Sequence, residues 1–299
     1  MEKLLDYHKG ILGDELPLFR EWVAKPLRKA IRVNPLRTSI AGFKGELESM
    51  GAEPIPWCPE GFRVKEWAWG ATIPHQLGYY YIQEAASMVP AEALMPAGPG
   101  RKPGTGDCIL DLAAAPGSKT TQLAPRCSTI VANEPDPNRR KALFSNLNRC
   151  GVMNAIITGY DGTRFPSAGF DKVLLDAPCS NIGAARKNKD ILKEWSLNRS
   201  KKLATLQKRL LKSAFDLLNP GGALVYSTCT TTLEENEEVV LELLDERQDS
   251  KLETVNLPVV SHPGLLPGTE KCLRIYPWDN DTEAFFVARV AKGGKRKKG

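Results

Sequence analysis

The sequence predicts an α/β fold in which a parallel, doubly wound sheet follows a smaller N-terminal α/β unit. From Asp107 onward, short apolar segments alternate with segments of helical periodicity, which is typical of a parallel sheet with helices on both faces. A connector rich in Pro and Gly, residues 96–106, precedes this region and indicates a boundary between two units. The chain has 299 residues, of which 42% are hydrophobic, so it can form a sizeable core and is long enough for two domains.

The N-terminal unit is expected to begin with helices, because apolar residues recur at roughly helical intervals up to about residue 25. A short strand is expected at residues 30–35, a helix at 38–50 and a second strand at 53–57. After a loop, another helix is expected near Glu84. We assign residues 1–95 to this N-terminal helical and α/β module.

The second unit is expected to alternate strands with helices along most of its length. Strands are expected at residues 108–112, 129–133, 155–158, 172–175, 223–227 and 285–290. Helices are expected to begin at 119 and to span 138–150, 197–218 and 234–245, with a turn at 219–222. We assign residues 96–292 to a second domain and residues 293–299 to a basic, disordered tail.

The charge balance permits nucleic acid binding without establishing it. The chain carries 41 Lys and Arg against 35 Asp and Glu, a formal net charge of +6. Each basic cluster, taken alone, is more often a solvated face than a binding site. The clusters are Arg28, Lys29 and Arg32 near the start, Arg186, Lys187 and Lys189 in the middle, and Lys201, Lys202, Lys208, Arg209 and Lys212 on one predicted helix.

The cysteine pattern indicates free thiols in a reducing, cytoplasmic compartment. The chain has seven cysteines, an odd number, with no close Cys-x-x-Cys pair, and only three histidines. We therefore expect no metal site. No secretory segment and no apolar run of 18 residues is present, so no membrane association is expected. Five cysteines are expected to be small buried hydrophobes: Cys58, Cys108, Cys127, Cys150 and Cys272.

A loop of small residues between a predicted strand and helix, residues 111–120, is suited to a nucleotide-like cofactor. Small residues let the backbone approach a ligand closely, and the helix start favours a carboxylate or phosphate. The spacing excludes a Walker phosphate loop, because Ser118 separates Gly117 from Lys119. Taken alone, about half of such loops are only tight turns.

Acidic residues at successive strand ends strengthen this interpretation. Glu134 lies 17 residues past Gly117 (134 − 117), where an acid binds a ribose diol in nucleotide-binding α/β folds. Asp161 follows the third strand, where it can accept a hydrogen bond from an adenine amino group. Asp111 and Asp176 end the first and fourth strands. Ligands of such sheets bind at the carboxyl ends of the strands.

Two further cysteines, Cys179 and Cys229, also follow strands that should border this crevice. Two thiols and an acid beside a methyl donor suit the methylation of a poor carbon nucleophile, carbon 5 of cytosine. A thiolate that adds at carbon 6 makes carbon 5 nucleophilic, and Asp176 is placed to stabilise the adduct. The target base must leave its stack to reach the pocket. This chemistry alone leaves open which cysteine attacks.

These motifs resemble the RsmB/Nop/Sun family of RNA 5-methylcytosine methyltransferases over about residues 30–290. The resemblance implies a Rossmann-like, S-adenosylmethionine-dependent methyltransferase core behind an RNA-recognition-like module. The motifs that carry it are Arg32 to Pro35, Gly78 to Glu84, Asp111 to Thr120, Asp176 to Ser180, Ser227 to Thr230 and Glu234 to Glu237.

The resemblance also implies residue roles. Cys229 would be the nucleophile, Cys179 would assist release, and Asp176 and Lys119 would complete the catalytic group. The cofactor-binding residues would be Ala113, Ala114, Ala115, Pro116, Gly117, Ser118, Lys119, Glu134, Asp161 and Asp176.

The chain departs from the family pattern at three positions. Ala113 and Ser118 stand where a cysteine and a second glycine are common, and both are small enough to be tolerated. Leu233 stands where a proline commonly precedes the Glu-Glu-Asn-Glu run, which would loosen the start of the following helix. The compact length is similar to that of the archaeal transfer RNA enzymes, so transfer RNA is the expected substrate and ribosomal RNA the alternative. The sequence does not indicate which protein partners the chain has.

Three other classes fit less well. Enzymes that methylate an amino group carry an aromatic residue in the fourth-strand loop, where this chain has Asp-Ala-Pro-Cys. DNA carbon 5 enzymes use one cysteine in that loop and have no need for Cys229. An RNA-binding assembly factor without catalysis is disfavoured by the complete set of cysteines, Lys119 and acids.

Overall fold

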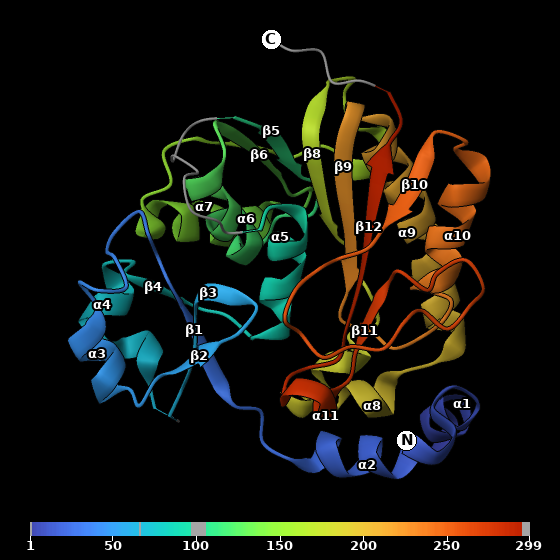
Figure 1. The fold of residues 1–299 in the computed structure, drawn as a ribbon, viewed down its shortest axis with the longest axis horizontal. Helices are drawn as coiled ribbons and strands as arrows, with labels where there is room; N and C mark the ends of the chain where they lie inside the picture. The colour runs from blue at the N-terminus through green and yellow to red at the C-terminus, as the bar shows by residue number, and fades with distance from the viewer. Residues whose placement is uncertain (1, 66, 97–105, 295–299) are drawn as a thin grey trace.

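The computed structural model describes residues 2–65, 67–96 and 106–294, which form a small antiparallel sheet beside a large mixed sheet (Figure 1). The connector expected at 96–106 falls mostly on residues outside this range. Residues 295–299 of the expected disordered tail also lie outside it. Gly293, by contrast, donates a backbone hydrogen bond of 2.7 Å to Asp249.

The N-terminal module begins with two helices, α1 (Glu2–Leu12) and α2 (Leu16–Ala24), as expected. Its four strands are antiparallel in the order β2-β3-β1-β4. They are β1 (Lys29–Val33), β2 (Glu53–Ile55), β3 (Cys58–Val64) and β4 (Tyr80–Ile82), with short helices α3 (Lys44–Ser49) and α4 (Ile73–Gln76) between them. The helix expected at 38–50 is thus much shorter. The sequence interpretation missed β3, whose Pro59 and Gly61 resemble loop residues, and β4.

The large sheet has the order β10-β12-β9-β8-β5-β6-β7, with β11 paired to β12. Its strands are β5 (Cys108–Asp111), β6 (Thr129–Asn133), β7 (Ala155–Thr158), β8 (Phe170–Asp176), β9 (Leu218–Thr228), β10 (Ser250–Glu253), β11 (Leu273–Ile275) and β12 (Phe285–Lys292). Strands β5 to β9 are parallel, as expected. The expectation of an entirely parallel sheet is wrong at one edge, because β12 runs antiparallel to β9, β10 and β11.

Helices cover both faces of the large sheet, which confirms the doubly wound arrangement (Figure 1). Strand β9 shows how this works: Val225 belongs to the core cluster with α5, α6 and α7, whereas Leu224 and Tyr226 belong to the cluster with α9 and α10. These helices are α5 (Val89–Leu94), α6 (Ser118–Leu123), α7 (Pro137–Cys150), α9 (Leu197–Asp216) and α10 (Glu237–Glu246). Two shorter helices, α8 (Ile191–Glu194) and α11 (Pro277–Asn280), lie near α2.

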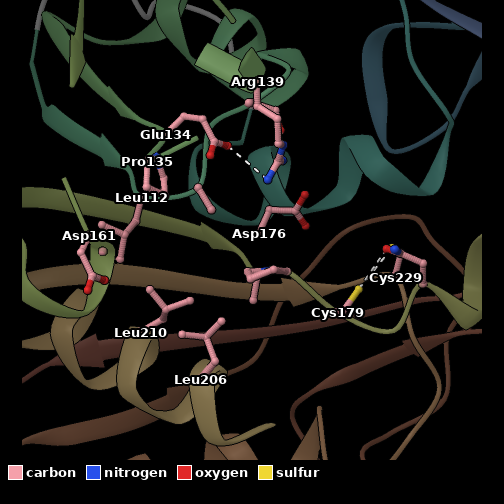
Figure 2. A pocket seen from close by; sticks show the side chains of 16 residues that line it. Leu112, Glu134, Pro135, Arg139, Asp161, Asp176, Cys179, Leu206, Leu210 and Cys229 are labelled. Atoms are coloured by element: carbon pink, nitrogen blue, oxygen red, sulfur yellow. Dashed lines mark hydrogen bonds and ion pairs between the residues drawn. The ribbon is translucent and has the colours of Figure 1, made fainter. Parts of the chain in front are cut away.

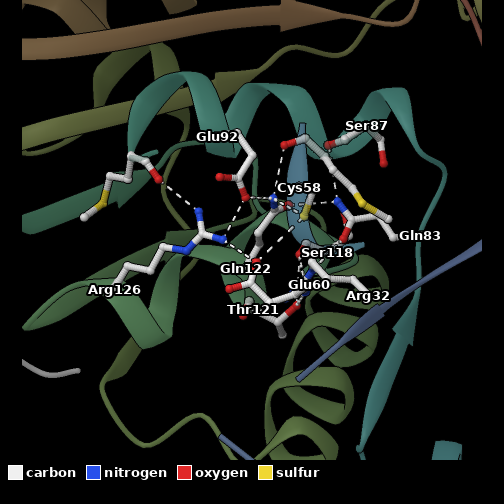
Figure 3. A network of polar contacts seen from close by, with 12 residues as sticks. Arg32, Cys58, Glu60, Gln83, Ser87, Glu92, Ser118, Thr121, Gln122 and Arg126 are labelled. Atoms are coloured by element: carbon white, nitrogen blue, oxygen red, sulfur yellow. Dashed lines mark hydrogen bonds and ion pairs between the residues drawn. The ribbon is translucent and has the colours of Figure 1, made fainter. Parts of the chain in front are cut away.

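A buried polar network joins the N-terminal module to the start of α6 (Figure 3). The guanidinium of Arg32, from β1, donates to Gln83 Oε1 at 2.9 Å, to Thr121 Oγ1 at 2.8 Å and to the Ser118 carbonyl at 3.2 Å. Gln122 of α6 donates in turn to Glu92 Oε1 at 2.9 Å. Because an unsatisfied buried polar group is costly, these bonds make the module and α6 one packed unit.

Helices α1 and α2 pack beneath the carboxyl end of the large sheet, against α8 and α11 (Figure 1). His8 Nε2 lies 2.6 Å from Thr231 Oγ1, and Tyr7 donates to Glu234 Oε2 at 2.5 Å. These contacts hold the loop after β9, which begins at Cys229. Within the described residues, no helix combines the length and apolar character needed to cross a membrane.

Candidate active site

A cavity of about 390 Å³ opens at the carboxyl ends of β5, β6, β8 and β9 (Figure 2). After β7 the chain returns to place β8 beside β5, so the cavity lies where the strand order reverses, the place at which such sheets bind ligands. The lining residues are Leu112, Ala113, Ala115, Glu134, Pro135, Arg139, Asp161, Gly162, Asp176, Ala177, Pro178, Cys179, Asn181, Leu206, Leu210 and Cys229.

The loop between β5 and α6 is held in place by hydrogen bonds to its backbone. The Ala114 amide donates to the Asn133 carbonyl at 2.9 Å, and Asn146 donates to the Pro116 carbonyl at 2.9 Å. Gly117 has a φ of 106°, and a Cβ there would lie 3.1 Å from Leu143 Cδ1, so glycine is required. Of the predicted loop residues, Ala113 and Ala115 line the cavity, whereas Ala114, Pro116, Gly117, Ser118 and Lys119 are not among its lining residues.

Asp111 supports this loop from behind, outside the cavity lining. Its carboxyl group is buried and accepts a hydrogen bond of 2.7 Å from Thr120 Oγ1. Burial raises the pKa of Asp111 to about 7, against an ordinary value of 3.8. Asp111 therefore fixes the start of α6, the helix that carries Lys119.

Glu134 places a carboxylate on the cavity wall, as expected (Figure 2). The side chain is 2% exposed, and its Oε1 accepts from the Asp136 amide at 3.0 Å. Its Oε2 accepts no hydrogen bond and lies 3.3 Å from Nη1 of Arg139, whose side chain is mostly exposed. A buried carboxylate oxygen with spare accepting capacity fits the hydroxyl groups of a ribose.

Asp161 lies on the same wall and begins a short 3₁₀ segment, Gly162–Arg164. Its Oδ1 accepts from both the backbone amide and the hydroxyl of Thr163, each at 2.9 Å. These hydrogen bonds lower the pKa of Asp161, so the group stays ionised and keeps its accepting capacity at neutral pH.

The two predicted thiols meet at the other end of the cavity (Figure 2). Cys179 Sγ lies 3.4 Å from Cys229 Sγ, and both cysteines are free. Asn181 Oδ1 lies 3.1 Å from the Cys229 sulfur and 3.4 Å from the Cys179 sulfur. The hydrogen bond with Cys179, together with burial, raises the pKa of Cys229 well above its ordinary range, so this residue is a thiol at rest.

A hydrogen-bonded group of Lys119, Asp176 and Ser227 lies beside the thiols. Lys119 Nζ donates to Asp176 Oδ2 at 2.6 Å, and Ser227 Oγ donates to Asp176 Oδ1 at 2.7 Å. The Lys119 ammonium also lies 5.4 Å from the centre of the Phe285 ring. Burial lowers the pKa of Lys119, but the Asp176 carboxylate outweighs this and raises it overall. Lys119 therefore reaches the site through Asp176, and both groups are held in one orientation.

The structure thus brings together Glu134, Asp161, Asp176 and both cysteines at one cavity. Among the lining residues that the sequence interpretation missed, two have polar side chains, Asn181 and Arg139. The only available signal for Asn181 was its position two residues after Cys179. Arg139 lies on α7 and looks like an ordinary exposed helix residue.

Within the described residues, Cys58, Glu60 and Glu92 form a group with metal-ligand spacing. The guanidinium of Arg126 lies 2.9 Å from Glu60 Oε2 and 2.7 Å from Glu92 Oε1 (Figure 3). A cation of the protein itself therefore already bridges the two carboxylates of this group.

Comparison with known families matches both parts of the chain. The model of a family described as 16S rRNA methyltransferase RsmB/F matches residues 101–291. A model of the N-terminal domain of 16S rRNA methyltransferase RsmF matches residues 2–85. The expected Rossmann-like methyltransferase core behind an N-terminal module is confirmed.

Several curated relatives of the chain are bacterial proteins. Ribosomal RNA small subunit methyltransferase F of Escherichia coli O6:H1 is 44% identical over 289 residues, and that of Citrobacter koseri is 43% identical over 287. Each alignment covers 90% of this chain and 58% of the relative, so the chain spans little more than half of their length. These relatives are bacterial ribosomal RNA enzymes and not the archaeal transfer RNA enzymes that we expected. The compact length of the chain, on which that expectation depended, is not a guide to the type of enzyme.

Solved structures agree on the fold. The crystal structure of NSun6 from Pyrococcus horikoshii with SFG has a TM-score of 0.86 and 25% identity and covers 99% of both chains. A methyltransferase homolog protein from the same organism has a TM-score of 0.82 and 32% identity and covers 96% of this chain and 93% of its own. By its sequence and its fold, the chain belongs to the RsmB/F family of rRNA methyltransferases.

Proposed function

We propose that this chain is a cytoplasmic enzyme that methylates carbon 5 of a cytosine in small-subunit ribosomal RNA, with S-adenosylmethionine as the methyl donor. The observation that carries the proposal is the pair of thiols, 3.4 Å apart, in one cavity with the carboxylates of Glu134 and Asp176, the second of which is bonded to Lys119. Ribosomal RNA replaces transfer RNA as the favoured substrate because the curated relatives are named small subunit rRNA methyltransferases.

The wall formed by Ala113, Ala115, Glu134 and Asp161 suits the adenosyl part of the donor. Glu134 Oε2, which has no hydrogen bond, would accept from a ribose hydroxyl, and the ionised Asp161 would accept from the adenine amino group. The small alanine side chains leave room for the backbone of the loop to approach the ligand. When bound, S-adenosylmethionine supplies an electrophilic methyl group.

The remaining wall suits a cytosine that has left its stack. The sulfur of Cys229 would add to carbon 6 as the thiol proton passes to ring nitrogen 3, which turns carbon 5 into a nucleophile for the methyl group. Asp176, oriented by Lys119 and Ser227, would accept a hydrogen bond from the protonated ring nitrogen 3 and stabilise the adduct. After transfer, the proton on carbon 5 must leave so that the bond to Cys229 can break, and Cys179 is close enough to assist. The family resemblance supports this order of roles.

We further propose that residues 1–95 present the RNA to the cavity. The supporting observation is that this module is packed onto α6, the helix that carries Lys119, through the buried Arg32 network. RNA bound to the module would therefore be held in a defined position relative to the thiols.

Bisulfite sequencing tests the proposal directly, because 5-methylcytosine resists the reagent. The chain is incubated with the methyl donor and either small ribosomal subunit RNA or bulk transfer RNA that lacks the modification. Cys229→Ala serves as the matched control. We expect a newly protected cytosine in the ribosomal RNA only, and none with the variant. Protection in transfer RNA alone would contradict the substrate, and none in either RNA would contradict the reaction.

A further inference from the structure

Asn181 bridges the two thiols at the edge of the cavity. Its side-chain oxygen lies 3.1 Å from Cys229 Sγ and 3.4 Å from Cys179 Sγ. Among the described residues, each sulfur has only Asn181 and the other sulfur as a polar side-chain partner within hydrogen-bonding distance. The amide oxygen can therefore accept from either thiol, and within the part of the chain that the structure describes the only other acceptor in reach of each thiol is the partner sulfur.

The backbone at this position requires a left-handed conformation but does not require asparagine. Asn181 has a φ of 59° and a ψ of 22°, a region that glycine occupies without strain and asparagine tolerates. Neighbouring bonds fix the turn: the Ser180 amide donates to Glu235 Oε2 at 2.8 Å, and the Gly183 amide donates to the Cys229 carbonyl at 2.9 Å. Since glycine would satisfy the backbone, what asparagine adds here is its side-chain amide.

The charges around Cys229 favour the neutral thiol. Besides Cys179 in the loop after β8, the carboxylates of Asp176, at the end of β8, and Glu283, before β12, act on its sulfur. The ammonium groups of Lys119, on α6, and Lys187, after the turn, act in the opposite direction. Both lysines are paired, Lys119 with Asp176 and Lys187 with Glu283 at 2.9 Å, so most of their charge is already compensated. A protonated sulfur needs an acceptor, and Asn181 provides it.

We propose that Asn181 holds Cys229 as a neutral thiol, and orients both sulfurs, until the RNA base enters. Its oxygen accepts from each thiol and so favours the protonated form, which is a poor nucleophile. Cys229 is thereby kept inert toward electrophiles in the resting site, and its sulfur is aimed at the cavity edge where Asn181 lies. The biological meaning of this inference rests on the proposed function. The protonation state of Cys229 does not depend on it.

The test is the pH dependence of cysteine alkylation in the full chain without RNA or methyl donor. Iodoacetamide labelling of Cys229 is followed by peptide mass spectrometry over a series of pH values, and the midpoint of the rate profile reports the thiol pKa. The half-buried Cys108 in the same digest is the internal control. Greater access of the reagent to the sulfur would change the plateau rate of alkylation but not the midpoint of the profile. A variant with a more accessible sulfur is therefore not mistaken for one with a changed thiol pKa.

Asn181→Gly is the decisive variant, because glycine keeps the left-handed turn and removes the amide. We expect the midpoint of Cys229 to fall by roughly half a unit to one unit, the equivalent of one ordinary hydrogen bond. Asn181→Asp, of equal shape, should raise it by about one unit or more, because a carboxylate repels the thiolate. Asn181→Ser, whose hydroxyl is too short to reach both sulfurs, should lower it as glycine does.

An unchanged Cys229 midpoint in both Asn181→Gly and Asn181→Ser would overturn the inference. That result would leave the proposed function standing, because methyl transfer by the unmodified chain is measured separately. Conversely, lowered midpoints in a chain that methylates no RNA would support the thiol bridge while the proposed function failed.

Discussion

Glu134 offers the most quantitative test of the cofactor wall. Its carboxylate is 2% exposed, and Oε2 has no hydrogen bond of its own, so a ribose hydroxyl would make a new bond without displacing an existing one. A hydrogen bond to a charged group is worth roughly 1.5–3 kcal/mol. Glu134→Ala should therefore weaken the binding of S-adenosylmethionine about tenfold to a hundredfold.

Isothermal titration calorimetry with the chain alone measures this loss. Asp136→Ala is the matched control: it lies in the same loop and caps α7, but it is not among the cavity-lining residues. It should lower the melting temperature and leave the dissociation constant unchanged. An unchanged constant for Glu134→Ala, or an equal loss in both variants, would refute the ribose contact.

Three further predictions concern the module, the loop support and RNA. Arg32→Ala should lower the free energy of unfolding, measured in urea, by about 3 kcal/mol, because buried acceptors lose their donor. The matched change at an exposed residue, Arg37→Ala, should alter the free energy of unfolding little. Equal effects of the two variants would contradict the role of the network. Because the pKa of Asp111 is raised, its contribution to stability is lost as pH rises from about 4 to about 7. In urea titrations, Asp111→Asn should remove this loss of stability. An unaltered pH dependence in the variant would refute the raised pKa. RNA affinity, measured by filter binding, should fall as salt rises because Lys and Arg contact phosphates, and a salt-independent affinity would rule this out.

The parallel part of the large sheet was predictable because each strand is a short apolar run that ends in an acidic or small residue. Strand β8, for example, carries Val173, Leu174 and Leu175, which are completely buried between the two helical layers. The antiparallel edge was not predictable in the same way. Strand β10 has the sequence Ser-Lys-Leu-Glu, and only Leu252 is buried, so its apolar signal is too weak to distinguish it from a loop.

The site was predictable where a residue type implies its chemistry. A cysteine after one parallel strand and an acid after another strand of the same sheet could be placed at one crevice by topology alone, as for Cys229 and Glu134. The role of Asn181 could not be anticipated, because it depends on a left-handed turn that aims the amide at both sulfurs. The proposed RNA substrate could not be anticipated either, because that proposal depends on relatives rather than on any residue of the cavity.

In the proposed mechanism, Cys229 forms the covalent adduct and Cys179 helps to resolve it. The most direct measurement is a denaturing gel of the chain incubated with labelled RNA and S-adenosylmethionine. Cys229→Ala should show no RNA-linked band and no methyl transfer. Cys179→Ala should show a slowly migrating RNA-linked band, because attack and methylation proceed but the adduct is not released. A band from Cys229→Ala and none from Cys179→Ala would contradict this assignment of roles.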